Sequence, residues 1–131
     1  MRDMLDHRSN KPWWLPVIVA VGGGLMILGA VIALLNPAML LSKGAEINGA
    51  VRVYAGYLVS RNLAIGGLLL GALVRRARGA LSVLMLLAGV IQILDAVIDG
   101  AEGRWVLVPG VAVLGIAFLF GANEASKASE R

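Results

Sequence analysis

The stretch YAGYLVSRNLAIGGLLLGALVRR, residues 54–76, has the length and apolar character of a membrane-spanning helix, yet Arg61 lies in its interior. At about 1.5 Å per residue, such a helix crosses a hydrocarbon core that is about 30 Å thick. An unpaired charged side chain at this depth costs ~3 kcal/mol or more, so it is expected to face protein and to be paired. The stretch therefore predicts a membrane bundle that supplies an acidic partner for Arg61.

The composition of the whole chain is typical of a membrane protein. Of its 131 residues, 59% are hydrophobic and 15% are charged, whereas soluble domains are about half apolar and about a quarter charged. The chain has no Cys and one His, His7, which excludes disulfides and argues against a zinc or haem site. The net charge is +4, and the Lys and Arg residues that cause it lie beside apolar segments and form no basic domain. Nucleic acid is therefore not an expected partner.

Four apolar segments follow one another along the chain, at residues 13–35, 52–74, 80–99 and 105–122. The connections RRARG (75–79) and GAEGR (100–104) are too short to join anything but antiparallel neighbours. The predicted fold is therefore all-α, with residues 1–131 forming a single four-helix transmembrane bundle. Residues 123–131 are small and polar, and we expect them to form a mobile tail.

The Lys and Arg residues predict the orientation of the bundle. In a four-span protein the two tails and the middle connection share one side, and here they contain Arg2, Arg8, Lys11, Arg75, Arg76, Arg78, Lys127 and Arg131. The other side contains Lys43 and Arg104, with Arg52 near its surface. By the positive-inside rule, both termini are expected in the cytoplasm, with the chain integral to a bacterial plasma (inner) membrane.

The register between the second and third spans indicates which residue pairs with Arg61. If the chain reverses near Ala77, Arg61 lies level with position 93 and close to Asp95, roughly 18–21 Å from the inner boundary. Asp95 is the only acidic residue deep in a span. We therefore predict a buried Arg61–Asp95 ion pair. The residues expected to form its polar shell, and with it a ligand site or polar core, are Asn62, Gln92, Tyr54 and Tyr57.

Two interpretations of this pair remain open. It is either a structural clip between the second and third spans, or the centre of a ligand or proton site. The third span adds a regular pattern, because Gln92, Asp95, Asp99 and Glu102 are spaced three, four and three apart and share one helical face. Asp99 and Glu102 lie nearer the outer end of the span, where we expect a solvated helix terminus. No catalytic residue and no metal ligand is predicted.

Small residues four apart predict where helices approach closely, because membrane helices pack through small side chains. The pairs with this spacing are Ala20/Gly24, Gly29/Ala33, Gly67/Gly71, Ala96/Gly100 and Ala117/Gly121.

The segment from residue 60 to residue 100, which begins SRNLAIGG and ends ILDAVIDG, resembles the small DoxX-like four-helix membrane proteins. In these proteins the second span begins with an Arg-Asp or Arg-Asn pair that is followed by a small residue and Gly. A basic hairpin and an Asp-Ala near the end of the third span complete the pattern. The residues that fit are Arg61, Asn62, Ala64, Gly66, Asp95 and Ala96, with Asn62 where Asp is common. The resemblance implies a four-helix membrane fold without an established reaction, and some such proteins are linked to quinone-dependent oxidation complexes.

Two classes of function are compatible with the sequence. The first is a non-catalytic membrane protein that binds a lipid-like or quinone-like ligand, or serves as an accessory subunit of a larger membrane complex or homo-oligomer. The second is a small proton- or cation-coupled transporter that uses Asp95. An enzyme is less favoured, because no nucleophile with its base and no metal constellation can be assembled. The expected pairing of Asp95 favours the first class, with a quinone or a lipid as its candidate ligand.

Cysteine labelling tests the predicted orientation without background, because the chain has no Cys. In intact cells, a membrane-impermeant thiol reagent is expected to modify Lys43→Cys and Gly103→Cys. Ser126→Cys is expected to react only after the membrane has been permeabilised. Modification of Ser126→Cys in intact cells would reverse the assignment of the two sides.

Overall fold

The computed structural model of the protein describes residues 12–41 and 43–130. In order along the chain its elements are α1 (Trp14–Leu35), the short 3₁₀ helix η1 (Pro37–Leu40), α2 (Gly49–Val74), α3 (Arg78–Ala101) and α4 (Val108–Ser129). These described residues contain no strand. The predicted all-α fold is therefore confirmed. All four α-helices are also long and apolar enough to span a membrane, as the sequence predicts.

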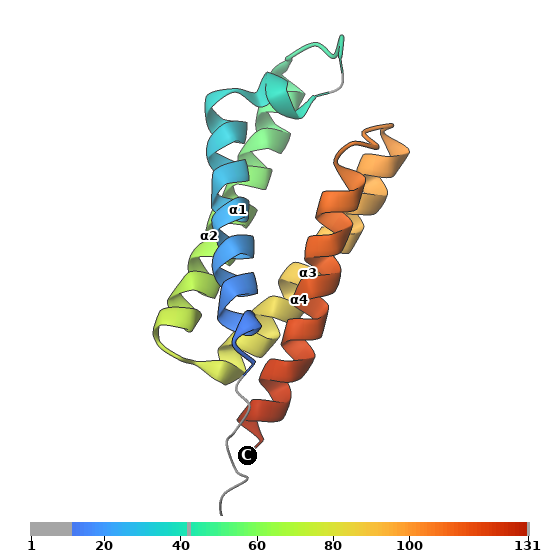
Figure 1. Ribbon diagram of the computed structural model, residues 1–131. Helices are drawn as coiled ribbons and strands as arrows, with labels where there is room; N and C mark the ends of the chain where they lie inside the picture. Colours follow the sequence, from blue (N-terminus) through green and yellow to red (C-terminus); the bar gives the residue numbers. More distant parts are fainter. Residues whose placement is uncertain (1–11, 42, 131) are drawn as a thin grey trace, which may run out of the picture.

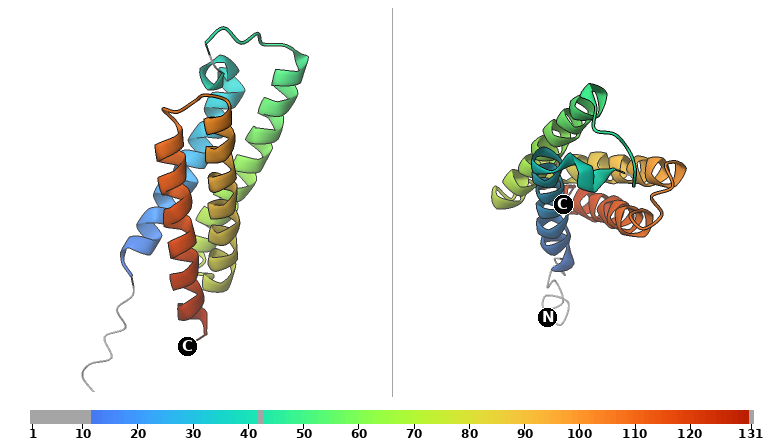
Figure 2. Two further views of the ribbon diagram at one scale, coloured as in Figure 1. Left: turned by 90° about the vertical axis from the view of Figure 1, so that its right-hand side faces the viewer. Right: turned by 90° about the horizontal axis from the view of Figure 1, so that it is seen from above.

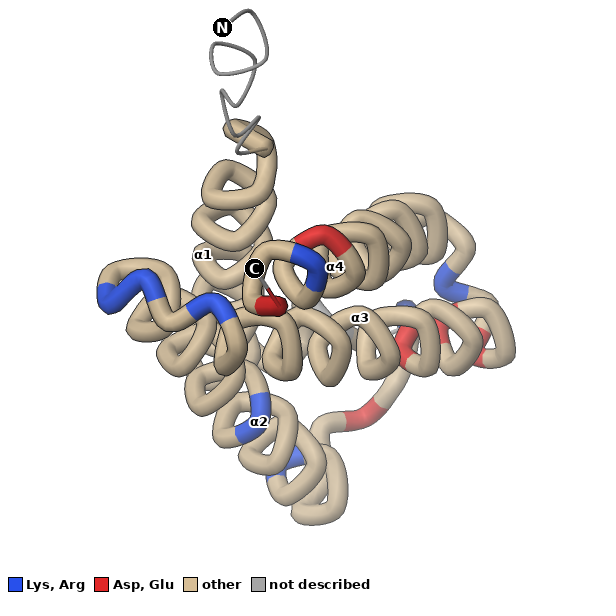
Figure 3. The backbone as a smooth tube through the Cα atoms, turned by 90° about the horizontal axis from the view of Figure 1, so that it is seen from below, with Lys and Arg blue, Asp and Glu red and all other residues tan. Residues whose placement is uncertain are grey.

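The four α-helices form two antiparallel pairs that diverge from one end (Figure 1). α1 packs along α2, and α3 packs along α4, whereas the two pairs contact each other less extensively. The pairs meet at the end that carries the α2–α3 turn and the end of α4 (Figure 2). We call this the basic end, since Lys and Arg residues gather there (Figure 3). The opposite end, with the connections 36–48 and 102–107, is called the loop end.

Local chemistry sets where the helices begin. Asn48 caps α2, because its side chain accepts a hydrogen bond from the backbone N–H of Val51 at 3.0 Å. Pro109 lies in the first turn of α4. Backbone N–H groups in the first turn have no partner within the helix, so the helix loses no hydrogen bond to proline there. The predicted span at 105–122 therefore begins too early, since residues 105–107 form a turn that precedes α4.

The end of α4 also differs from the prediction. The helix continues to Ser129, so most of the segment 123–131 that was expected to be a mobile tail is helical. Ala122 and Ala125 are buried, and Ser82 Oγ on α3 donates a hydrogen bond to the carbonyl oxygen of Ala122 at 2.9 Å. These contacts attach the last turns of α4 to α3, and Arg131 lies outside the described residues.

Two close backbone approaches hold the helices of each pair together. A Cβ placed at Gly66 of α2 would lie 2.9 Å from the carbonyl oxygen of Gly23 on α1. A Cβ placed at Gly89 of α3 would lie 3.1 Å from the carbonyl oxygen of Gly115 on α4. A side chain at Gly66 would clash with the α1 backbone, and one at Gly89 would force its neighbours to move, so glycine lets these helices approach and gain packing contacts.

The small-residue pairs predicted from the sequence are only partly the ones that pack. Gly121 does pack closely, against Met85 of α3 and Leu15 of α1. Gly67 and Gly71, by contrast, have no atom within 4 Å of an added Cβ, and neither has Gly24. On α2 the contact with α1 is therefore made by Gly66, and the predicted Gly67/Gly71 pair faces outward.

The hydrophobic core lies in the half of the bundle nearer the basic end. Its largest fully buried side chains are Phe118, Leu69, Met85 and Val19, which come from all four helices. Phe118 of α4 packs over Gly22 of α1 and so joins the two pairs. None of these four side chains lies in the half nearer the loop end, where the two helix pairs separate (Figure 1).

The close approach at Gly66 predicts that two adjacent glycines respond differently to the same substitution. Gly66→Ala places a Cβ against the α1 backbone, and such overpacking typically costs about 1–3 kcal/mol. Gly67→Ala meets nothing within 4 Å and gains up to ~1 kcal/mol of helix propensity. Thermal unfolding in one detergent is expected to give a lower midpoint for Gly66→Ala than for wild type, and an equal or higher midpoint for Gly67→Ala. Equal effects at both positions would contradict this helix crossing.

Candidate functional site

A cleft with a volume of about 930 Å³ opens between the two helix pairs, toward the loop end. Residues from all four α-helices, from η1 and from the α3–α4 connection line it. Most of the lining residues are apolar, among them Leu25, Met26, Val51, Leu58, Ile98 and Leu114. The polar residues in the lining are Tyr54, Tyr57, Arg61, Asn62, Gln92, Asp95, Asp99 and Arg104.

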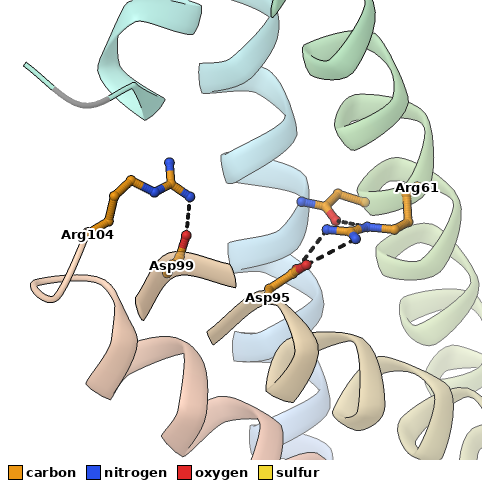
Figure 4. Close-up of polar contacts among 5 residues, drawn as sticks. Arg61, Asp95, Asp99 and Arg104 are labelled. Carbon is orange, nitrogen blue, oxygen red and sulfur yellow. Dashed lines mark hydrogen bonds and ion pairs between the residues drawn. The ribbon is translucent and has the colours of Figure 1, made fainter. Parts of the chain in front are cut away.

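Arg61 of α2 and Asp95 of α3 lie in contact on the wall of this cleft (Figure 4). Arg61 Nη2 donates to Asp95 Oδ2 at 2.7 Å, and Nη1 donates to Oδ1 at 3.2 Å. Arg61 Nε lies 3.4 Å from Asn62 Oδ1, to which it also donates. The two hydrogen bonds to Asp95 form the two-pronged geometry that gives Arg–carboxylate pairs their directional specificity.

The surroundings of this pair differ from the prediction of a buried site. The side chains of Arg61 and Asp95 are 34% and 27% exposed. The physical reason is the divergence of the two helix pairs, which leaves an open cleft where a closed bundle would have covered the contact. The two residues therefore join α2 to α3 and at the same time present polar atoms to the cleft.

A second ion pair, which the sequence reasoning missed, joins Asp99 of α3 to Arg104 of the α3–α4 connection (Figure 4). The side chain of Asp99 is only 6% exposed, so the expectation of a solvated terminus is wrong for Asp99. Glu102 is exposed and does not line the cleft. Of the four residues predicted to share this face of α3, only the first three therefore line the cleft: Gln92, Asp95 and Asp99.

The C-terminal cap of α3 positions this second pair. Gly103 has a φ of +73°, a left-handed conformation that glycine adopts without strain. The N–H of Gly103 donates to the carbonyl oxygen of Gly100 at 3.2 Å, and the N–H of Arg104 donates to that of Asp99 at 2.8 Å. These two bonds form a Schellman cap, which folds Arg104 back over the last turn of α3. The sequence signal for the pair is therefore Gly103 together with the five-residue spacing of Asp99 and Arg104.

The remaining predicted site residues all line the cleft. Gln92 is a buried polar residue of α3, one turn before Asp95. Tyr54 and Tyr57 of α2 are 74% and 69% exposed. In the described part of the chain, their hydroxyl groups make no hydrogen bond to Arg61 or Asp95. The two tyrosines thus line the cleft on the same helix as Arg61, outside the hydrogen bonds of the ion pair.

The cleft offers hydrogen-bonding groups and apolar surface. Across residues 12–41 and 43–130, no three His, Cys, Asp or Glu side chains come together as metal ligands. Both acids that line the cleft are engaged by Arg residues. Such a cleft can form hydrogen bonds with the polar group of a molecule and contact the apolar remainder of that molecule.

Comparisons with models of known protein families, with curated proteins and with solved structures give no match to this chain. The likeness of residues 60–100 to the DoxX-like proteins therefore stays a prediction from the sequence.

A double-substitution cycle tests the coupling between Arg61 and Asp95. Arg61→Gln and Asp95→Asn each leave the opposite charge without its partner. Removal of one partner from a fully buried pair costs ~3–5 kcal/mol, and we expect a smaller loss here because both side chains are partly exposed. The double substitution is expected to destabilise the protein by less than the sum of the two single changes, as measured by thermal unfolding in detergent.

The matched control for this cycle is the ion pair of Lys127 with Glu124 on α4, whose side chains are 59% and 37% exposed. Exposed pairs contribute about 0–1 kcal/mol, so the same cycle is expected to show little coupling there. If the losses at Arg61 and Asp95 simply add, the two residues are not coupled.

Proposed function

We propose that this protein is a non-catalytic membrane protein that binds an amphipathic molecule, lipid-like or quinone-like, in the cleft between its helix pairs. The observation that supports this function is the cleft itself, which combines apolar walls from four helices with polar groups converging around Arg61 and Asp95. Binding sites for small molecules are typically of this kind, with volumes of about 300–1,000 Å³, mostly apolar walls and a few placed polar groups.

The distribution of polar groups indicates how such a molecule would lie. Gln92, Asp95 and Asp99 follow one another along one wall, and Leu25 and Leu58 contribute apolar surface from α1 and α2. A polar head group would contact the wall formed by α3, while its apolar portion would lie along the aliphatic side chains. Hydrocarbon tails alone cannot hydrogen-bond to the partly exposed pair, so a molecule with a polar head group fits the cleft better than a lipid tail does.

The orientation predicted from the charge distribution completes this proposal. With both termini in the cytoplasm, the basic end lies at the inner face of the plasma membrane, and the cleft opens in the outer half of the bilayer. The ligand would then enter from the outer leaflet or from the outer surface. In a larger membrane complex, the protein would act as an accessory subunit that holds this ligand for a partner.

A small proton- or cation-coupled transporter is the second candidate. The observation that favours it is the partial exposure of Asp95 in a cleft that opens toward one end of the bundle. A carrier carboxylate must bind and release its cargo, whereas both oxygens of Asp95 accept hydrogen bonds from Arg61. Transport would require this two-pronged contact to break in each cycle, so ligand binding is the better-supported function.

Filling the cleft is expected to displace the ligand. Gly110 lines the cleft, and an added Cβ there meets nothing within 4 Å, so the side chain of Gly110→Leu starts in open space and is expected to occupy part of the cleft. Gly67→Leu is the matched control, because Gly67 is equally open but does not line the cleft. Native mass spectrometry of gently solubilised protein should show a retained amphipathic molecule on wild type and on Gly67→Leu, with at least roughly tenfold lower occupancy on Gly110→Leu, or ~1.4 kcal/mol.

Two kinds of result, one from ligand retention and one from transport, would contradict the binding function. One is wild-type protein that retains no amphipathic molecule, or equal occupancy on the two leucine variants. The other is proton flux in sealed vesicles that depends on an added cationic substrate and is abolished by Asp95→Asn, which would support the transporter.

A further inference from the structure

We propose that the molecule bound in the cleft has a head group without net charge, either zwitterionic or uncharged. This inference rests on the proposed binding function and adds the chemical class of the ligand. It comes from the Asp99–Arg104 pair, which lines the same cleft as Arg61 and Asp95.

The four charged side chains form a row in which the two acids lie between the two arginines (Figure 4). Asp95 and Asp99 are four residues apart on α3 and so are neighbours on one helical face. Arg61 reaches Asp95 from α2, and Arg104 reaches Asp99 from the α3–α4 connection. Two helices and one connection thus build a single wall that carries both ion pairs.

The charges of this wall cancel. Two Arg and two Asp are the only charged residues in the cleft lining among the described residues, so the two positive and two negative charges sum to zero. Each acid is also engaged locally, since Asp95 accepts two hydrogen bonds from Arg61 and Asp99 accepts one from Arg104. The wall therefore has no surplus charge with which to compensate a charged head group.

A head group with a net charge would be disfavoured in these surroundings. Transfer of an uncompensated charge from water to an apolar site is unfavourable, and an anion that recruits Arg61 or Arg104 would compete with the acid that each arginine already engages. A head group without net charge avoids both costs. Its dipoles can hydrogen-bond to the partly exposed edge of the Arg61–Asp95 pair and to Gln92 while both ion pairs stay intact.

Three lipids with identical acyl chains test this inference: phosphatidylethanolamine (zwitterionic), diacylglycerol (uncharged) and phosphatidylglycerol (anionic). Each is added to delipidated full-length protein in mild detergent, and the bound fraction is read by native mass spectrometry. We expect phosphatidylethanolamine and diacylglycerol to be retained on wild type roughly tenfold more than phosphatidylglycerol, a ratio equivalent to ~1.4 kcal/mol.

A change in the charge of the wall is expected to change the preference. Asp99→Asn gives the cleft a net charge of +1 and should raise retention of phosphatidylglycerol relative to phosphatidylethanolamine by roughly tenfold. Glu102→Gln is the matched control, because it removes a negative charge three residues away, at an exposed position outside the cleft, and should leave the preference unchanged. If Asp99→Asn does not fold, Asp95→Asn makes the same charge change at a more exposed position and must give the same shift.

The outcomes separate this inference from the function on which it rests. Retention of phosphatidylethanolamine without a preference over phosphatidylglycerol would overturn the inference and leave ligand binding intact. The same holds if Glu102→Gln shifts the preference as much as Asp99→Asn does, since the effect would then come from the overall charge of the protein. Failure to retain any of the three lipids would overturn this inference, and the proposed function falls with it only if gently solubilised wild-type protein also carries no amphipathic molecule.

Discussion

The requirement that Arg61 be paired inside an apolar helix constrains the whole structure. A guanidinium at membrane depth needs an anion beside it, and Asp95 meets that need across the gap between α2 and α3. Satisfying both prongs of the contact fixes how far α2 and α3 can slide past each other, and hence the register across the α2–α3 turn. It also limits the separation of α2 and α3 at the level of Arg61.

The connectivity explains why the bundle opens at one end only. Residues 75–77 are the one covalent link between the two pairs, and they lie at the basic end. At the loop end, connection 36–48 joins helices within one pair, and connection 102–107 joins helices within the other. The large buried side chains, such as Phe118, reinforce the end that is already linked. Farther from that link, the Arg61–Asp95 ion pair is the polar side-chain contact described between α2 and α3.

The sequence predicted the features that depend on charge and hydropathy along the chain, and it missed those that depend on helix rotation or on a single dihedral angle. The spans and the register that brings Arg61 to Asp95 follow from apolar lengths and a short turn. When every face of a helix is apolar, hydropathy cannot tell whether Gly66 or Gly67 faces the neighbour, although they point about 100° apart. The Asp99–Arg104 contact likewise depends on the left-handed backbone of Gly103, which turns a loop residue back onto α3.

Under the proposed function, the structural and ligand-binding interpretations of the Arg61–Asp95 pair are compatible with each other. A pair sealed in a packed core would serve as a clip and nothing more, whereas this pair holds α2 to α3 and keeps a polar edge in the cleft. In a membrane, the apolar walls of such a cleft can be covered by hydrocarbon at little cost, but the polar edge cannot. The molecule that we propose as the ligand would bring hydrogen-bonding groups to the depth of Asp95 and apolar surface to the rest of the cleft. A charge-balanced wall makes the same demand on that molecule's head group, since it accepts a dipole and has no counter-charge to spare for an ion.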